Sequence, residues 1–123
     1  MIPFPSSDID DALDHKTRST LKEILVLLEQ EIKPQQVILF GSHASGGADD
    51  ESDLDILIIG PSDERPLDRI RKVRRLLHTY DRQIGLDILF YTPQEVQLLA
   101  SEPSSFLCSI RNRGLLIYDN KDF

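Results

Sequence analysis

The sequence lacks several features that define other classes of protein. It has one cysteine, Cys108, so no internal disulfide can form, which fits a reducing cytoplasm. No run of apolar residues approaches the roughly 20 that are needed to span a bilayer. The start, MIPFPSSDIDDALD, lacks the basic and then apolar order of a signal peptide. These absences predict a cytoplasmic protein with no membrane segment.

Basic residues are fewer than acidic ones. The chain has 14 Lys and Arg against 21 Asp and Glu, which gives a formal net charge of −7 at pH 7. Nucleic-acid-binding modules normally carry a basic footprint, so this balance argues against direct binding of nucleic acid. Seven basic residues nevertheless gather within residues 65–82: Arg65, Arg69, Arg71, Lys72, Arg74, Arg75 and Arg82. This run is either a solvated helix face or a docking surface for an acidic partner or its RNA.

The length predicts a single domain. At 123 residues and 14.0 kDa, the chain is long enough for one core but too short for a second. The apolar fraction of 40% and the charged fraction of 28% are ordinary for a globular protein. Residues 1–13 contain prolines and several acids, and we expect a loose arm there. Residues 14–123 then form the domain.

Apolar periodicity predicts an alternation of helices and strands. Helices are expected at 14–32, 66–82, from Pro93 onward and at 104–113, and strands at 36–40, 54–59, 86–91 and 115–118. Residues 42–47 are expected to form a short helical turn and 48–52 an acidic loop. Thr92 and Glu95 have capping-box spacing around a proline at the first helical position. The order α-β-β-α-β-α-α-β predicts an α+β (α/β) fold, in which helices flank a small mixed sheet.

The segment 41–58, GSHASGGADDESDLDILI, carries the strongest sign of chemistry. Gly41 and Ser42 leave a strand in a turn whose N–H groups and hydroxyl can bind a phosphate. Asp53 and Asp55 are two residues apart on the next strand, so they share a face. Adjacent carboxylates repel unless a divalent cation neutralises them, and oxygen ligands of this kind suit Mg²⁺. The motif therefore predicts a metal site beside a phosphate site, the minimum apparatus for nucleotidyl transfer.

Asp87 is the expected third carboxylate. It lies within the strand-like segment LDILFY, where strand propensity disfavours aspartate. If this strand lies beside Asp53 and Asp55, three carboxylates converge on two metal ions. One ion activates the attacking oxygen and the other steadies the triphosphate and the leaving pyrophosphate. Asp53 and Asp55 would bind both ions, and Asp87 would bind the activating ion and accept the proton of the hydroxyl. The alternative for Asp87 is an edge-strand aspartate that faces water.

These residues resemble the minimal nucleotidyltransferases of the DNA polymerase β superfamily, which share the pattern Gly-Ser, ten residues, Asp-x-Asp. The chain is most similar to the small MNT antitoxins that partner HEPN-domain toxins in prokaryotes. LDILFYTPQEV matches the third-carboxylate strand and following helix of that family, and SFLCSIRNRGLLIYD matches its usual ending. The resemblance covers nearly the whole chain and implies a nucleotidyltransferase fold.

The resemblance implies that AMP is transferred from ATP to a tyrosine hydroxyl of a cognate HEPN RNase toxin, which neutralises the toxin. Carried over by position, Gly41 and Ser42 would hold the triphosphate, and Asp53, Asp55 and Asp87 would hold two Mg²⁺ ions. The protein would then form a hetero-oligomer with its toxin. Two other functions stay open. The chain could inhibit a toxin by binding alone, or it could modify a small molecule or an RNA end.

One position departs from the family pattern. Many of these proteins read Gly-Ser-x-Ala-Arg-Gly, whereas Ser45 stands where the arginine would be. Loss of a charge-assisted phosphate contact costs about 1.5–3 kcal/mol of nucleotide binding. The departure predicts weaker nucleotide binding and is the feature that favours a non-catalytic antitoxin. His43 is read either as a phosphate contact or as a surface residue, and Cys108 as part of the core.

Overall fold

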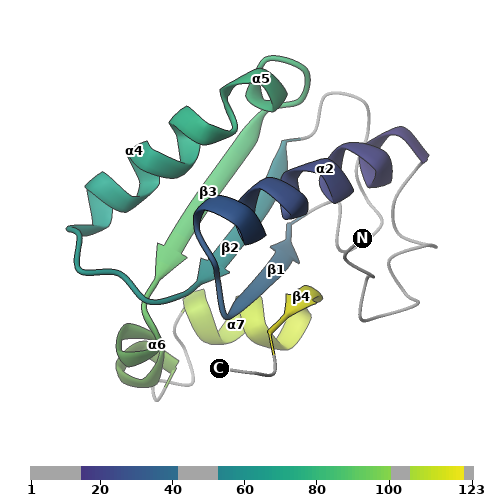
Figure 1. Ribbon diagram of the computed structural model, residues 1–123. Coiled ribbons are helices and arrows are strands. Elements are labelled where there is room, and N and C mark those ends of the chain that lie inside the picture. The colour runs from purple at the N-terminus through teal and green to yellow at the C-terminus, as the bar shows by residue number, and fades with distance from the viewer. Residues whose placement is uncertain (1–14, 42–52, 101–105, 121–123) are drawn as a thin grey trace.

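The computed structural model describes residues 15–41, 53–100 and 106–120, which Figure 1 draws as coloured ribbon. A four-stranded sheet with strand order β3-β2-β1-β4 forms its centre. The strands are β1 (Gln36–Phe40), β2 (Leu54–Ile59), β3 (Leu86–Tyr91) and β4 (Leu115–Asp119). β1 pairs antiparallel with both β2 and β4, while β2 and β3 run parallel. The predicted mixed sheet is confirmed.

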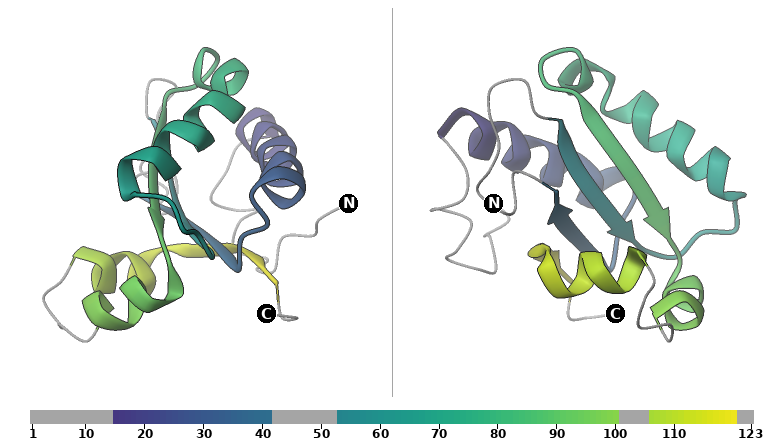
Figure 2. Two further views of the ribbon diagram at one scale, coloured as in Figure 1. Left: turned by 60° about the vertical axis from the view of Figure 1, so that its left-hand side comes forward. Right: turned by 180° about the vertical axis from the view of Figure 1, so that it is seen from behind.

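Helices cover both faces of this sheet, as Figures 1 and 2 show. α2 (His15–Glu31) and α4 (Pro66–Leu76) lie on one face, and α6 (Pro93–Ala100) and α7 (Phe106–Arg113) lie on the other. Each face has its own apolar core. Leu54 and Ile56 of β2 pack with the α2 and α4 side, whereas Leu57 packs with the α6 and α7 side. This alternation is the two-residue period of a strand that is covered on both faces. The predicted fold class is confirmed.

The helix predicted at 66–82 is wrong in one respect, because the structure divides it. α4 ends at Leu76, and a separate short helix, α5, spans His78–Asp81. Leu77 breaks the helix with φ −99° and ψ 14°. The break allows Asp81 to reach the start of β3, where its Oδ1 accepts a hydrogen bond of 2.9 Å from the backbone N–H of Leu86. A tertiary contact thus decides the helix end, which helical periodicity does not reveal.

The other predicted elements lie within a residue or two of the observed ones wherever the structure describes them. The reciprocal capping box at the start of α6 is confirmed. The backbone N–H of Thr92 donates to Glu95 Oε1 at 2.8 Å, and that of Glu95 donates to Thr92 Oγ1 at 3.3 Å. The arm at 1–13, the helical turn at 42–47 and the acidic loop at 48–52 lie outside the described residues. Among the helices of the described ranges, none has the length and apolar character needed to cross a membrane.

Candidate functional site

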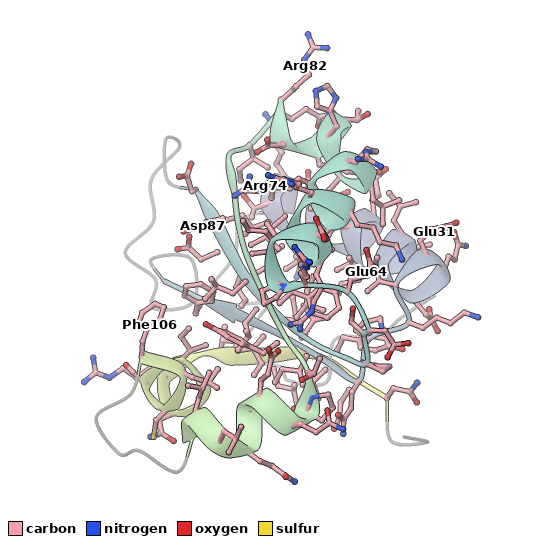
Figure 3. All side chains as sticks on the ribbon, turned by 90° about the vertical axis from the view of Figure 1, so that its left-hand side faces the viewer. Glu31, Glu64, Arg74, Arg82, Asp87 and Phe106 are labelled. Atoms are coloured by element: carbon pink, nitrogen blue, oxygen red, sulfur yellow. The ribbon has the colours of Figure 1, made fainter. Side chains whose placement is uncertain are left out.

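Three side chains form a row across the sheet at the end where β2 and β3 begin. Asp55 on β2 lies opposite Asp87 on the parallel strand β3 and opposite Phe40 on the antiparallel strand β1. Partners on neighbouring strands project from the same face, which here is the α6 and α7 face because Leu57, two residues after Asp55, packs there. In Figure 3, Asp87 points away from α4 and lies on the same side as Phe106. The expected neighbourhood of Asp55 and Asp87 is therefore present.

Two glycines lie directly against the carboxylates. A Cβ built on Gly41 would stand 1.9 Å from Asp55 Oδ2, and one built on Gly85 would stand 2.1 Å from Asp53 Oδ1. Gly41 also has a φ of 76°, which side-chain-bearing residues rarely adopt. Any larger residue at either position would displace a carboxylate. The role of Gly85 was missed in the sequence, although a glycine directly before a strand that holds an aspartate is a usable signal.

The carboxylates differ in their access to solvent. Asp53 and Asp87 are exposed, whereas Asp55 is half-buried between its two neighbouring strands. In residues 15–41, 53–100 and 106–120, no three His, Cys, Asp or Glu side chains lie close enough together to form a ready metal site. The three aspartates thus line one end of the sheet without being drawn into a single cluster. Their carboxylate oxygens are hard ligands of the kind that Mg²⁺ prefers.

The start of β3 is braced by the α4–α5 region. Arg74 Nη1 donates to the carbonyl of Leu86 at 3.3 Å, while Asp81 accepts from the N–H of the same residue. The carbonyl of Gly85 accepts a hydrogen bond of 2.8 Å from the N–H of Leu54. These contacts fix the backbone directly before Asp87. Of the predicted phosphate residues, Gly41 lies at the end of β1, whereas Ser42 lies outside the described residues, as do His43 and Ser45.

One residue of the basic run does not belong to a solvated face. Arg69 is buried and its guanidinium binds both carboxylate oxygens of Glu95, at 2.6 and 3.3 Å. It also donates to the carbonyls of Glu64 and Phe90 and lies over the Phe90 ring. The charge and hydrogen bonds of Arg69 lower the pKa of Glu95 below its ordinary value. Other members of the run are exposed, including Arg71, Lys72 and Arg75.

The chain belongs to the polymerase β nucleotidyltransferase family, whose model matches residues 20–123. Two proteins of Methanocaldococcus jannaschii named as candidate protein adenylyltransferases are similar to it. The first is 31% identical over 90 residues, which are 71% of this chain and 60% of that relative. The second is 31% identical over 85 residues, which are 66% of this chain and 83% of that relative. The chain therefore spans less than two thirds of the first relative's length.

Solved structures share the fold. A candidate nucleotidyltransferase from Sulfolobus solfataricus has a TM-score of 0.59 at 20% identity, with 94% of this chain and 91% of that chain covered. A toxin–antitoxin structure with AMP-PNP has a TM-score of 0.58 at 24% identity, with 82% and 74% covered. A mutant of the toxin–antitoxin MntA–HpeT has a TM-score of 0.53 at 21% identity, with 83% and 74% covered. The predicted nucleotidyltransferase fold is thus confirmed.

Proposed function

We propose that this chain is a Mg²⁺-dependent nucleotidyltransferase that moves AMP from ATP to a tyrosine hydroxyl of a cognate HEPN RNase toxin and thereby neutralises it. The observation that carries the proposal is the strand register that sets Asp55 opposite Asp87. Gly41, at the end of β1, lies against Asp55 at the same end of the sheet. The names of the similar proteins support the acceptor class, since two are candidate protein adenylyltransferases and others are toxin–antitoxin assemblies.

Asp53, Asp55 and Asp87 would hold the metal ions, and Gly41 with Ser42 would hold the triphosphate. When bound, Mg²⁺ would neutralise the charge of the phosphates and of the departing pyrophosphate. The half-buried position of Asp55 between two strands makes it the natural anchor of the site. Asp53, directly before β2, and Asp87, on β3, are exposed and open to the nucleotide and to an acceptor.

The proposed reaction uses these residues as follows. The tyrosine oxygen attacks the α-phosphorus of ATP and forms the new P–O bond. The bond between the α-phosphorus and the oxygen that bridges to the β-phosphate breaks, and pyrophosphate leaves with that bond's electron pair. Asp87 accepts the proton of the attacking hydroxyl and later releases it to solvent. An exposed carboxylate at the sheet margin suits this role, because the acceptor belongs to another folded protein.

A labelling experiment tests the proposal. Purified chain is mixed with purified toxin, Mg²⁺ and ATP that is labelled at the α-phosphate, and the label is expected on the toxin together with a loss of RNase activity. ATP labelled at the γ-phosphate is the control and should leave the toxin unlabelled. Transfer of γ-label would indicate phosphorylation instead of AMP transfer and would overturn the proposal.

A non-catalytic antitoxin is the second candidate. Ser45, in place of the arginine in many relatives, favours it. In that case RNase activity falls when the chain is added without ATP, and neither label moves to the toxin. The same experiment therefore separates the two functions. If label instead appears on a small molecule or an RNA end, which mass spectrometry would identify, the acceptor class is wrong while the chemistry stands.

A further inference from the structure

A cavity of about 310 Å³ lies between the end of β1 and α7. Phe40 and Gly41 line it from the sheet, and Phe106, Ser109 and Arg113 line it from the helix. Its volume is within the range of about 300–1,000 Å³ that is typical of small-molecule sites. Gly41 belongs to both places, because it lines the cavity and lies against the carboxylate of Asp55. The cavity therefore adjoins the row of carboxylates at Gly41.

The apolar lining consists of an aromatic pair. The rings of Phe40 and Phe106 meet edge to face, with centroids 6.1 Å apart and planes at 86°. Such a contact uses one face of one ring, so the pair itself does not occupy the remaining ring faces. Phe106 is 65% exposed, although Leu107 and Ile110 of the same helix are buried. An exposed aromatic beside a cavity is the arrangement on which nucleobases stack in proteins that bind single-stranded nucleic acids.

Two polar groups complete the cavity. The Ser109 hydroxyl can donate and accept a hydrogen bond, which suits the edge of a base. The Arg113 guanidinium is a permanent cation with donors only, and its exposed position lets it approach a ribose or a phosphate. Mostly apolar walls with few polar groups characterise sites for small organic ligands. The lining thus suits a flat heterocycle that carries anionic groups.

The row formed by Phe40, Asp55 and Asp87 indicates how a nucleotide would be oriented in the site. Phe40 lies beside Asp55 on the same face of the sheet, and Asp87 lies on the far side of Asp55. A nucleotide whose phosphates lie at the carboxylates has its base within reach of the aromatic pair. We infer that the cavity between β1 and α7 binds the base of the nucleoside triphosphate, stacked on Phe106. This inference rests on the proposed function for the nucleotide and adds where its base binds.

A single tryptophan tests the inference, since the chain contains none. Phe106→Trp places a fluorophore in the cavity wall, and ATP with Mg²⁺ is expected to quench it by stacking. Tripolyphosphate with Mg²⁺ provides the phosphates without a base and is expected to leave the emission unchanged. Leu67→Trp on α4 is the matched control, because Leu67 is 64% exposed and does not line the cavity. Its emission should respond to neither compound.

Affinities measured by calorimetry complete the test. Phe106→Ala is expected to weaken ATP binding about 5- to 100-fold, the usual loss when a stacking aromatic is removed, and to leave tripolyphosphate binding unchanged. Ser109→Trp, which fills the cavity, should weaken ATP binding in the same way. Leu67→Ala should change neither affinity. Circular dichroism at matched temperatures checks that each variant is folded.

The outcomes separate the two proposals. Equal affinity of the wild type for ATP and tripolyphosphate, or an unaltered ATP affinity in Phe106→Ala, overturns the base site while AMP transfer still stands. A wild type that binds neither compound and transfers no AMP overturns the proposed function and, with it, the base site. Emission of the Phe106→Trp variant that responds to toxin but not to ATP assigns the cavity to the partner and overturns the inference.

Discussion

Asp55 and Asp87 occupy the same level of two parallel strands, and each projects toward the side of the sheet that α6 and α7 cover. The register of the two strands against one another sets these two residues side by side. The glycines beside Asp53 and Asp55 keep the backbone close to those carboxylates.

Replacing Asp53 and Asp55 together by asparagine should abolish AMP transfer without unfolding the domain. Removing like charges that lie close together relieves repulsion when no metal is bound, so the melting temperature without Mg²⁺ should be unchanged or higher. Mg²⁺ should raise the melting temperature of the wild type, since it binds the folded state alone, but not that of the double variant. Full transfer by the double variant would refute the metal assignment.

Asp87→Asn should lower the transfer rate by about 10²–10⁴, the usual contribution of a general base. ATP affinity should change much less, because Asp87 is assigned to the attacking hydroxyl. Asp63→Asn is the matched control, an exposed aspartate in the loop after β2. Transfer rates and nucleotide affinities of both variants are measured side by side. A rate for Asp87→Asn equal to that of the control would make Asp87 an ordinary solvent-facing aspartate.

Gly85→Ala should impair transfer more than stability. The added Cβ would stand 2.1 Å from Asp53 Oδ1, so the carboxylate must move, whereas no left-handed backbone angle penalises alanine there. Gly60→Ala is the control at the opposite end of the sheet, where the new Cβ meets the Pro34 backbone at 3.1 Å. That variant should lose stability and keep its transfer rate per folded molecule. Urea unfolding and initial rates distinguish the two effects, and the opposite pattern would remove Gly85 from the site.

The Arg69–Glu95 pair should contribute to stability in a pH-dependent way. The pKa of Glu95 is lowered from 4.5 in the folded state, so the contribution is present above pH 4.5 and is lost as the pH falls through the lowered value. Glu95→Gln should remove this part of the acid sensitivity. Urea unfolding from pH 7 down to about pH 3 measures it. Identical pH profiles of the variant and the wild type would show that Glu95 does not govern the loss.

Removing the buried cation of Arg69 is predicted to lower the free energy of unfolding more than removing an exposed cation does. Arg69→Met leaves the Glu95 carboxylate and two carbonyls without their donor and should cost about 2–3 kcal/mol of unfolding free energy. Lys72→Met is the control, because its 3.5 Å contact with Glu64 is exposed on both sides. Its cost should stay within about 0.5 kcal/mol. Equal losses of unfolding free energy in the two variants would mean that burial of Arg69 adds nothing to stability.

The sequence predicted the strands and the family because local signals coincide there. The alternation of Leu54, Asp55 and Ile56 and the spacing of Asp53 and Asp55 depend only on neighbours along the chain. The division of the 66–82 helix and the burial of Arg69 could not be predicted in the same way. Both depend on contacts with β3 and α6, which are distant in sequence.

In the candidate site, too, contacts between residues that are distant in sequence were hard to predict. The pairing of Asp55 with Asp87 was anticipated from the unusual aspartate within LDILFY and from the resemblance, since no periodicity states which strands are neighbours. The contact between Gly85 and Asp53, and the cavity shared by Phe40 and Phe106, arise from the packing of elements that are far apart in sequence. Ser42, predicted to hold a phosphate, stays a prediction.

Because β3 is an outermost strand of the sheet, Asp87 is secured by one ladder of hydrogen bonds to β2 and by the braces from Arg74 and Asp81. A strand with a single paired neighbour frays more readily than an interior one. Fraying at this margin would carry Asp87 away from Asp55 while leaving the central strands intact. The strength of this one ladder therefore sets how constantly Asp87 stands opposite Asp55.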